Sequence, residues 1–207
     1  MSHTHQRLIN GDARDLSFLE DESIHLVVTS PPYWNLKHYG KPYEPNAIIK
    51  NDMEFILMQR KPGGYRKPTE EQRRLSKIEK KDFDAWFQQI WNITGASTKN
   101  HPAPFPLELA TRLVRMFSFH GDTVLDPFCG TGTTMIAALR HGRNSIGIDI
   151  EPEYCRMAAR YLKKESSNLF MTAELIFEKI VPDHSGHTQV CEDQALYEVK
   201  SARKTLE

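Results

Sequence analysis

The stretch "VLDPFCGTGTT", residues 124–134, most constrains the fold of this chain. A short apolar run ends at Asp126, a glycine-rich turn follows, and "TTMIAALRH" (133–141) has the composition of a helix. A second apolar run, "NSIGID" (144–149), comes directly after that helix. Strand, turn, helix and strand in this order form a βαβ unit, which places the two strands parallel in one sheet. The sequence therefore predicts an α/β fold with a mostly parallel sheet.

The glycine-rich turn also predicts a ligand. Gly130 and Gly132 permit a tight turn that brings backbone N–H groups and the amino end of a helix close to a bound group. Asp149, at the end of the second strand, is well placed to accept hydrogen bonds from ribose hydroxyls. No Lys follows Gly132, as a P-loop requires, and Met135 stands where a dinucleotide-binding turn has its third glycine. The pattern indicates a nucleotide-like ligand and disfavours dehydrogenases and NTPases; the alternative is a turn that binds nothing.

The other expected elements surround this unit. Segments that predict strands lie at 7–11, 23–29, 53–59, 122–126 and 144–149. Segments that predict helices lie at 82–91, 106–119, 133–141 and 151–165. Because the chain is polar from residue 183, we expect one domain over 1–182 and a C-terminal tail over 183–207.

Composition and charge narrow the class of protein. The chain has 27 Lys plus Arg and 27 Asp plus Glu, so its net charge gives no support to nucleic-acid binding. The segment 59–81 is basic, however, with nine Lys or Arg and three Glu; it predicts either a solvated face or a surface that contacts phosphates. Three scattered cysteines favour neither disulfides nor a metal site. Without a secretory pattern or a long apolar run, we expect a cytoplasmic protein and no membrane partner.

A second motif, "TSPPYW" (29–34), follows directly on the apolar run "SIHLVV" (23–28). The two prolines hold the backbone rigid, and two large aromatic rings come next. Taken alone, this motif favours a simple interpretation, in which the prolines end the strand and the rings pack in the core.

Together, "TSPPYW" and the later "DPFCGTGTT" make the chain resemble the S-adenosylmethionine-dependent DNA amino-methyltransferases of the permuted β group. With Ser30 at its first variable position, the motif is most similar to that of the N4-cytosine enzymes of restriction-modification systems, since adenine enzymes more often carry Asp or Asn there. The resemblance covers residues 8–39 and roughly 40–165. It implies a Rossmann-like methyltransferase fold, S-adenosylmethionine as the cofactor, and double-stranded DNA as a partner. It also implies, as a further partner, a restriction endonuclease that shares the recognition site.

The resemblance also implies which residues form the site. The implied cofactor residues are Asp12, Phe105, Asp126, Pro127, Phe128, Gly130, Gly132, Thr133, Thr134 and Asp149. The implied catalytic residues are Ser30, Pro31, Pro32 and Tyr33. The DNA contacts are expected at Trp34, Arg60, Lys61, Arg66 and Lys67. No metal is implied.

The motif suits methylation of an exocyclic amine, which is a poor nucleophile because its lone pair is conjugated into the base. Ser30 Oγ can accept one hydrogen of the amine and the Pro31 carbonyl the other, while Tyr33 offers a flat face for a base flipped out of the duplex. Methyl transfer from a sulfonium then requires mainly position and electrostatics. Cys129, inside the glycine-rich turn, is expected to be a packing residue rather than a nucleophile.

Some alternatives stay open. After the motif, "YWNLKHY" meets "GKPYEP" almost at once, where family members carry further strands and helices, so the sheet is expected to lack strands. N6-adenine methylation by the same machinery is the nearest alternative. A truncated, inactive module that still binds the cofactor is another, and RNA methylation is less favoured. The oligomeric state is not predicted by the sequence.

Overall fold

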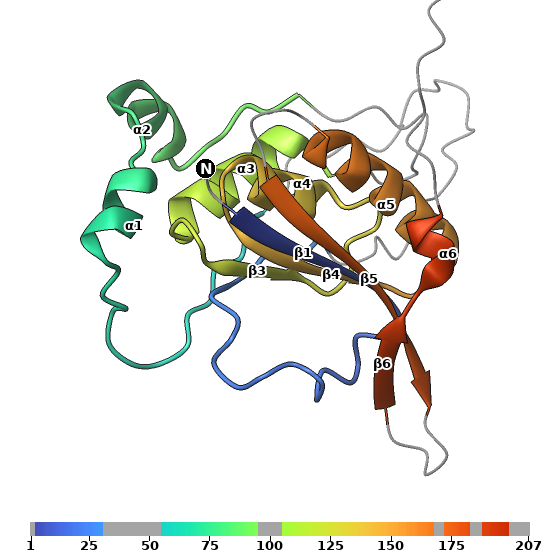
Figure 1. Ribbon diagram of the computed structural model, residues 1–207. Coiled ribbons are helices and arrows are strands. Elements are labelled where there is room, and N and C mark those ends of the chain that lie inside the picture. Colours follow the sequence, from blue (N-terminus) through green and yellow to red (C-terminus); the bar gives the residue numbers. More distant parts are fainter. Residues whose placement is uncertain (1–2, 31–54, 95–104, 168–171, 183–187, 199–207) are drawn as a thin grey trace, which may run out of the picture.

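A computed structural model describes residues 3–30, 55–94, 105–167, 172–182 and 188–198 of the chain. Six strands form one sheet in the order β2-β3-β4-β1-β5-β6 (Figure 1). The strands are β1 His3–Asn10, β2 Leu26–Val27, β3 Thr123–Asp126, β4 Asn144–Asp149, β5 Thr172–Pro182 and β6 Thr188–Glu192. The helices are α1 Glu70–Leu75, α2 Lys80–Trp86, α3 Leu107–Phe117, α4 Thr133–Arg140, α5 Pro152–Ser166 and α6 Gln194–Tyr197.

The sheet confirms the predicted fold class. All neighbouring strands pair in parallel except β5 and β6, which form an antiparallel hairpin. β3, α4 and β4 form the predicted βαβ unit, with Leu125 opposite Ile146 in the register. Because β1 to β5 run in one direction, their carboxyl ends meet at the same edge, where ligands of open α/β sheets bind.

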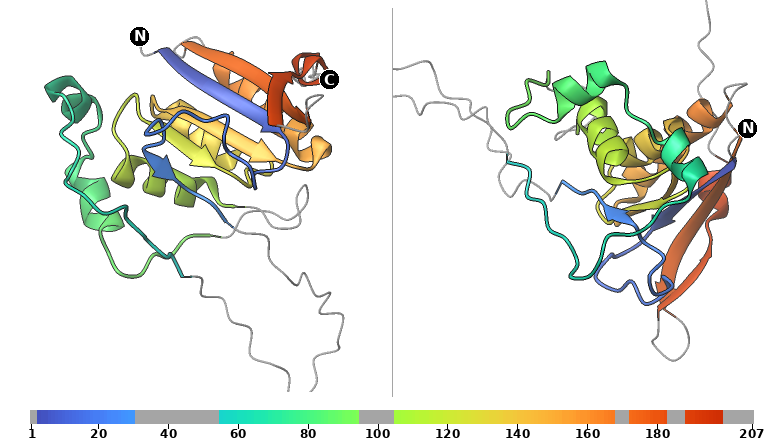
Figure 2. Two further views of the ribbon diagram at one scale, coloured as in Figure 1. Left: turned by 90° about the horizontal axis from the view of Figure 1, so that it is seen from below. Right: turned by 90° about the vertical axis from the view of Figure 1, so that its left-hand side faces the viewer.

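One face of the sheet is covered by α3, α4 and α5 (Figure 2). Near α4 and α5, Leu8 and Phe177 of the sheet pack against Met135 and Leu162 of the helices. Near α3, Val124 packs against the buried side chains of that helix. These three helices were predicted. The helix predicted over 82–91 also forms, but as α2 it begins at Lys80 and ends at Trp86.

The other face is covered differently along its length. At the carboxyl half, apolar side chains such as Ile148 are buried under the loop that follows β1. At the amino half, the outward side chains are polar: His5 pairs with Glu174 at 2.8 Å, and Arg7 pairs with Glu178 at 2.8 Å. Parallel sheets usually have helices on both faces. This part of the sheet has polar, paired side chains in place of a covering helix, and such side chains can face solvent.

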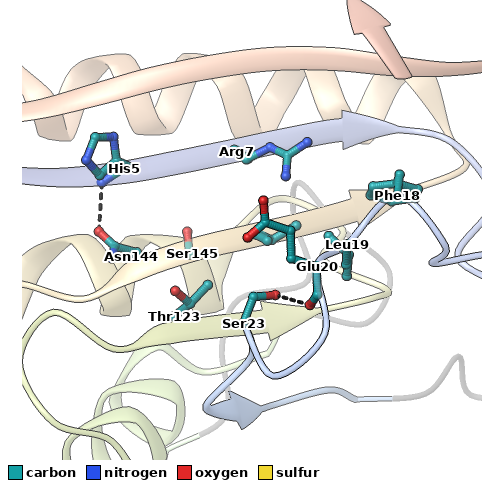
Figure 3. Close-up of a pocket in the computed structure, with 10 residues that line it drawn as sticks. His5, Arg7, Phe18, Leu19, Glu20, Ser23, Thr123, Asn144 and Ser145 are labelled. Carbon is teal, nitrogen blue, oxygen red and sulfur yellow. Dashed lines mark hydrogen bonds between the residues drawn. The ribbon is translucent and has the colours of Figure 1, made fainter. Parts of the chain in front are cut away.

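An open cavity of about 250 Å³ lies on this polar half (Figure 3). Its walls come from the first residues of three strands, including His5, Thr123 and Asn144, and from the loop near Glu20. The cavity therefore lies toward the amino ends of the strands, away from the edge where Asp126 and Asp149 end theirs.

Two predicted strands differ from the structure. β2 is only two residues long, and Val27 is 53% exposed, because β2 ends the sheet in the part of the chain that the structure describes. Residues 55–59 of the predicted strand 53–59 form no strand, and Phe55 is 90% exposed; residues 53 and 54 lie outside the described residues. An apolar run becomes a strand only where a partner strand can accept it, and the local sequence does not reveal the partner.

The prediction of a polar tail from residue 183 is wrong for residues 188–198. β6 pairs with β5, and α6 packs on the core, where Leu196 is 2% exposed. Lys163 Nζ donates to the Leu196 carbonyl at 2.9 Å, and the hydroxyl of Tyr197 accepts from Phe177 N–H at 3.2 Å. A few apolar side chains in a polar sequence are enough to hold this segment, which is why the composition was misleading. Within the described ranges, no helix is long and apolar enough to span a membrane.

Candidate active site

The two motifs of the sequence begin at the same edge of the sheet. β2 and β3 are parallel neighbours, and Val28 N–H donates to the Leu125 carbonyl at 3.0 Å just beyond their ends. The side chain of Thr29 lies close enough to the carboxyl group of Asp126 to lower its pKa, so the residue before Ser30 lies beside the strand that carries the glycine-rich turn. Ser30 is half-buried at this edge. Pro31, Pro32, Tyr33 and Trp34 lie outside the described residues.

The glycine-rich turn has the backbone that the sequence requires. Gly130 and Gly132 have φ values of 51° and 82°, in the left-handed region that favours glycine. A Cβ on Gly132 would lie 3.1 Å from Ala158 Cβ, so the turn also passes close to α5. α4 begins with Gly132 as its N-cap, without a side-chain cap. The amino end of α4 therefore keeps N–H groups that can receive a polar ligand.

Thr134, in the first turn of α4, adds a polar group to this region. Its side chain is 1% exposed and its hydroxyl has no hydrogen bond of normal geometry. It nevertheless lies close enough to the carboxyl group of Asp126 to lower the pKa of that group. A buried hydroxyl without a well-formed partner is uncommon and is expected where a ligand completes the hydrogen bonds.

Two further acids end neighbouring strands at this edge. Asp149 Oδ2 accepts from Gly130 N–H at 2.8 Å and its Oδ1 accepts from Glu151 N–H at 2.9 Å, so each oxygen keeps a further lone pair. Asp12 follows β1, and its carboxylate accepts from the Arg14 side chain at 2.7 Å, which lowers the pKa of Asp12. Gly11 N–H donates to the Asp149 carbonyl at 2.9 Å and so links the two loops.

Asp126 is the most perturbed of the three acids. It is 5% exposed, and burial raises its pKa from 3.8 to about 6. The hydrogen bond from Phe128 N–H, at 3.2 Å, and the nearby hydroxyls of Thr134 and Thr29 lower the pKa and oppose this change, whereas the charge of Asp149 adds to it. A carboxyl group with such a pKa, beside a glycine-rich turn, is typical of a functional site.

Cys129 lies inside the turn but is not poised for nucleophilic chemistry. It is 6% exposed, and burial raises the pKa of its thiol well above the usual value, so the reactive thiolate is disfavoured. A Cβ on Gly147 would lie 3.1 Å from Cys129 Cβ, which shows how closely the side chain packs against β4. In the described part of the chain, no cluster of three His, Cys, Asp or Glu could hold a metal ion.

Apolar side chains are also exposed at this edge. Phe128 is 50% exposed and Ile150 is 70% exposed. Phe105 packs partly buried against the cluster around α3. Pro127 and Thr133 are half-buried in the same turn. The sequence analysis did not single out Ile150; the signal for it is its place directly after Asp149, the last residue of β4.

Four of the five expected DNA contacts, Arg60, Lys61, Arg66 and Lys67, lie in the described part of the chain. Arg66 Nη2 pairs with the buried Asp122 at 2.5 Å, at the amino end of β3, so the structure does not bring Arg66 to the edge that holds Ser30. The guanidinium of Arg60 lies 3.9 Å from the centre of the Tyr65 ring and donates to the Gly63 carbonyl. Lys61 and Lys67 are exposed.

Comparison with known proteins agrees with this geometry. The sequence profile of the family described as DNA methylase matches residues 40–160, more than half of the chain. This chain belongs to the DNA methylase family.

Among family relatives, the type II methyltransferase M.MjaI of Methanocaldococcus jannaschii is 49% identical over 115 residues, which cover 52% of this chain and 37% of that relative. The DNA adenine methyltransferase YhdJ of Escherichia coli is 34% identical over 139 residues, which cover 61% of this chain and 46% of YhdJ. The chain thus spans less than half the length of these DNA methylases.

The fold of this chain is also that of a solved structure. TTHA0409 of Thermus thermophilus, a candidate DNA modification methylase crystallised with S-adenosyl-L-methionine, is 38% identical, with a TM-score of 0.67. The similarity covers 83% of this chain and 99% of the TTHA0409 chain. It confirms the predicted Rossmann-like methyltransferase fold.

Proposed function

We propose that this chain is an S-adenosylmethionine-dependent DNA methyltransferase that methylates the exocyclic N4 of cytosine. One observation carries the proposal: Ser30 and the glycine-rich turn around Gly130 lie at the same carboxyl edge of the sheet, through the contacts of Val28 and Thr29 with β3. This is the arrangement that methyl transfer between a bound cofactor and an amine at the "TSPPYW" motif requires.

The residues at this edge fit S-adenosylmethionine. The free lone pairs of Asp149 suit the ribose hydroxyls, and Asp12 suits an amine of the adenine. The uncapped amino end of α4 suits the carboxylate of the methionine end. The exposed side chain of Ile150 suits contact with the adenine ring. When bound, S-adenosylmethionine supplies a methyl group that its sulfonium has already activated.

The chain supplies position and hydrogen bonding. Ser30 Oγ accepts one hydrogen of the target amine, and the Pro31 carbonyl accepts the other, so that the nitrogen lone pair is aimed at the methyl group. Tyr33 receives the flipped base by stacking. These roles of Pro31 and Tyr33 rest on the resemblance, since both residues lie outside the described part of the chain.

The choice of cytosine N4 rests on Ser30 at the first variable position of the motif. The favoured alternative is adenine N6, because YhdJ, a DNA adenine methyltransferase, is among the relatives. An inactive module that binds the cofactor is a further alternative, because the chain spans only 37% of M.MjaI. Double-stranded DNA is the proposed substrate, and a cognate restriction endonuclease is the proposed partner in the cell.

One experiment tests the proposal. The protein is incubated with tritiated S-adenosylmethionine and mixed-sequence DNA, and the modified nucleoside is identified by mass spectrometry. We expect N4-methylcytosine. N6-methyladenine would support the alternative specificity, and cofactor binding by calorimetry without transfer to DNA would support the inactive module.

Ser30→Ala is the matched variant. It removes the proposed acceptor for the amine but leaves Asp12, Asp149 and the glycine-rich turn in place. We expect methyl transfer to fall by at least about tenfold, as for loss of one catalytic hydrogen bond. The dissociation constant for S-adenosylmethionine is expected to stay within about twofold, because a single hydrogen bond outside the cofactor contacts contributes little.

A further inference from the structure

Asn10, the last residue of β1, lies beside Asp149 in the parallel register. Its side-chain amide donates from Nδ2 to the Asp149 carbonyl at 3.0 Å and to the Ile150 carbonyl at 3.3 Å. Cys155 Sγ lies 3.6 Å from the same nitrogen. One planar amide group thus holds two successive carbonyls at the point where β4 ends.

The carboxylate of Asp149 is held in turn by the backbone on both sides of the site. It accepts from Gly130 N–H in the glycine-rich turn and from Glu151 N–H at the start of α5. The contacts therefore form a continuous path from Asn10, through the backbone of Asp149 and Ile150, to the turn at Gly130. The direction of the Asp149 carboxylate depends on a backbone segment that Asn10 fixes.

We propose that Asn10 is a positioning residue of the cofactor site, and this inference rests on the proposed function. Its amide orients Asp149 so that one carboxylate accepts hydrogen bonds both from the ribose hydroxyls and from Gly130 N–H of the glycine-rich turn. Only a side chain with two N–H donors on one nitrogen can satisfy both carbonyls from this position. Aspartate would place a negative charge against two carbonyl oxygens. Alanine would remove the Asn10 donor from both carbonyls, and the Asp149 carbonyl would keep only its bonds from Gly11 N–H and the Cys155 thiol.

Calorimetric titration with S-adenosylmethionine tests the inference on the full chain. Loss of two neutral hydrogen bonds at Asn10→Ala is expected to weaken cofactor binding about tenfold. Asn10→Asp is expected to weaken it further, and Asn10→Ser, which keeps one donor, is expected to give an intermediate loss.

In the methyl transfer assay, the KM for S-adenosylmethionine is expected to rise while kcat and the KM for DNA stay unchanged. A merely structural role would instead lower the active fraction and leave the cofactor affinity of the folded protein intact.

Asn144→Ala is the matched control. Asn144 begins the strand that Asp149 ends, and its amide makes similar bonds, donating to the Gly121 carbonyl at 3.0 Å and accepting from His5 N–H at 2.9 Å. We expect a similar fall in melting temperature for both alanine variants, but a change in cofactor affinity only for Asn10→Ala. Equal affinities in the two variants would overturn the inference. Failure of the wild-type protein to bind S-adenosylmethionine would instead overturn the proposed function.

Discussion

Asp126 is an acid whose pKa is higher in the folded chain than in the unfolded one, at about 6 against 3.8. The folded state therefore binds a proton more tightly than the unfolded state, and protonation stabilises the fold. This contribution is fully present below pH 3.8 and is lost as the pH rises through about 6. In Asp126→Asn, which mimics the protonated form, we expect unfolding at pH 7.5 to require up to about 3 kcal/mol more than in the wild type.

Chemical denaturation of both proteins between pH 4 and pH 8 measures this effect. His141 has the opposite influence on the wild-type profile, because burial lowers its pKa from 6.5 to about 4, so its neutral form is favoured in the fold. Because both proteins contain His141, its contribution cancels when their free energies of unfolding are subtracted. The advantage of Asp126→Asn should grow as the pH rises from 4 to 6; a difference that does not vary with pH would contradict the assigned pKa.

Gly132 has a positive φ and also leaves little room for a side chain, because Ala158 lies close to it. Gly121 has a similar φ but no close neighbour, so comparing the two positions separates the effect of φ from that of the contact. Both have similar φ values, 82° and 79°, but a Cβ on Gly121 would meet nothing within 4 Å, whereas one on Gly132 would lie 3.1 Å from Ala158. We expect Gly121→Ala to cost about 1 kcal/mol for its backbone conformation alone. Gly132→Ala should cost more and also weaken cofactor binding. Thermal unfolding and calorimetry check both points, and equal losses in the two variants would show that the contact with Ala158 is unimportant.

At the scale of the element, α1 and α2 are attached to the amino edge of the sheet. Gln72 Nε2 donates to the His120 carbonyl at 3.1 Å, Ser76 Oγ accepts from His120 N–H at 2.7 Å, and Arg115 pairs with Asp82 at 3.3 Å. The capping box of Thr69 with Gln72 explains why α1 forms in so short a segment. Among the basic residues of 59–81, Arg66 pairs with the buried Asp122, whereas Lys61 and Lys67 are exposed and have no such contact among the described residues.

This difference predicts separate effects for two arginines. Arg66→Ala should lower the melting temperature, because the buried Asp122 loses a partner, and should leave the salt dependence of DNA binding unchanged. If Arg60 contacts a phosphate, Arg60→Ala should leave the melting temperature unchanged. It should lower the slope of log affinity against log salt by about one. Binding isotherms at several salt concentrations measure these slopes. An effect of Arg66→Ala on the slope would place Arg66 in the DNA contact after all.

The C-terminal helix α6 is short but tied to the core. Leu196 packs in the cluster that contains Phe177 and Leu162. Leu196→Ala is expected to destabilise the protein by about 2–5 kcal/mol, as for other buried leucines. Leu75→Ala is a suitable control, because Leu75 is 41% exposed on α1. Similar unfolding midpoints for the two variants in urea would show that α6 contributes little.

At the scale of the whole molecule, several large apolar side chains are exposed. Phe55, Leu57 and Met58 are 90%, 83% and 69% exposed, and Val27 of the end strand is 53% exposed. Such surfaces favour self-association. We expect sedimentation velocity to show association at high concentration that Leu57→Lys reduces. A wild-type protein that remains monomeric would contradict this prediction.

The sequence by itself determined the βαβ unit, because Asp126, the glycine-rich turn and Asp149 depend on contacts within about one supersecondary unit. It also predicted that "TSPPYW" and that turn belong to one site; the structure describes only Thr29 and Ser30 of the motif, at the same edge of the sheet as the turn. It did not reveal Asn10 or Ile150, whose proposed roles depend on the strand that lies beside β4. The tertiary structure alone decided that residues 55–59 form no strand, that Leu196 is buried, and that Arg66 lies at the opposite edge from Ser30. These outcomes depend on partners distant in the sequence, and local composition does not specify such partners.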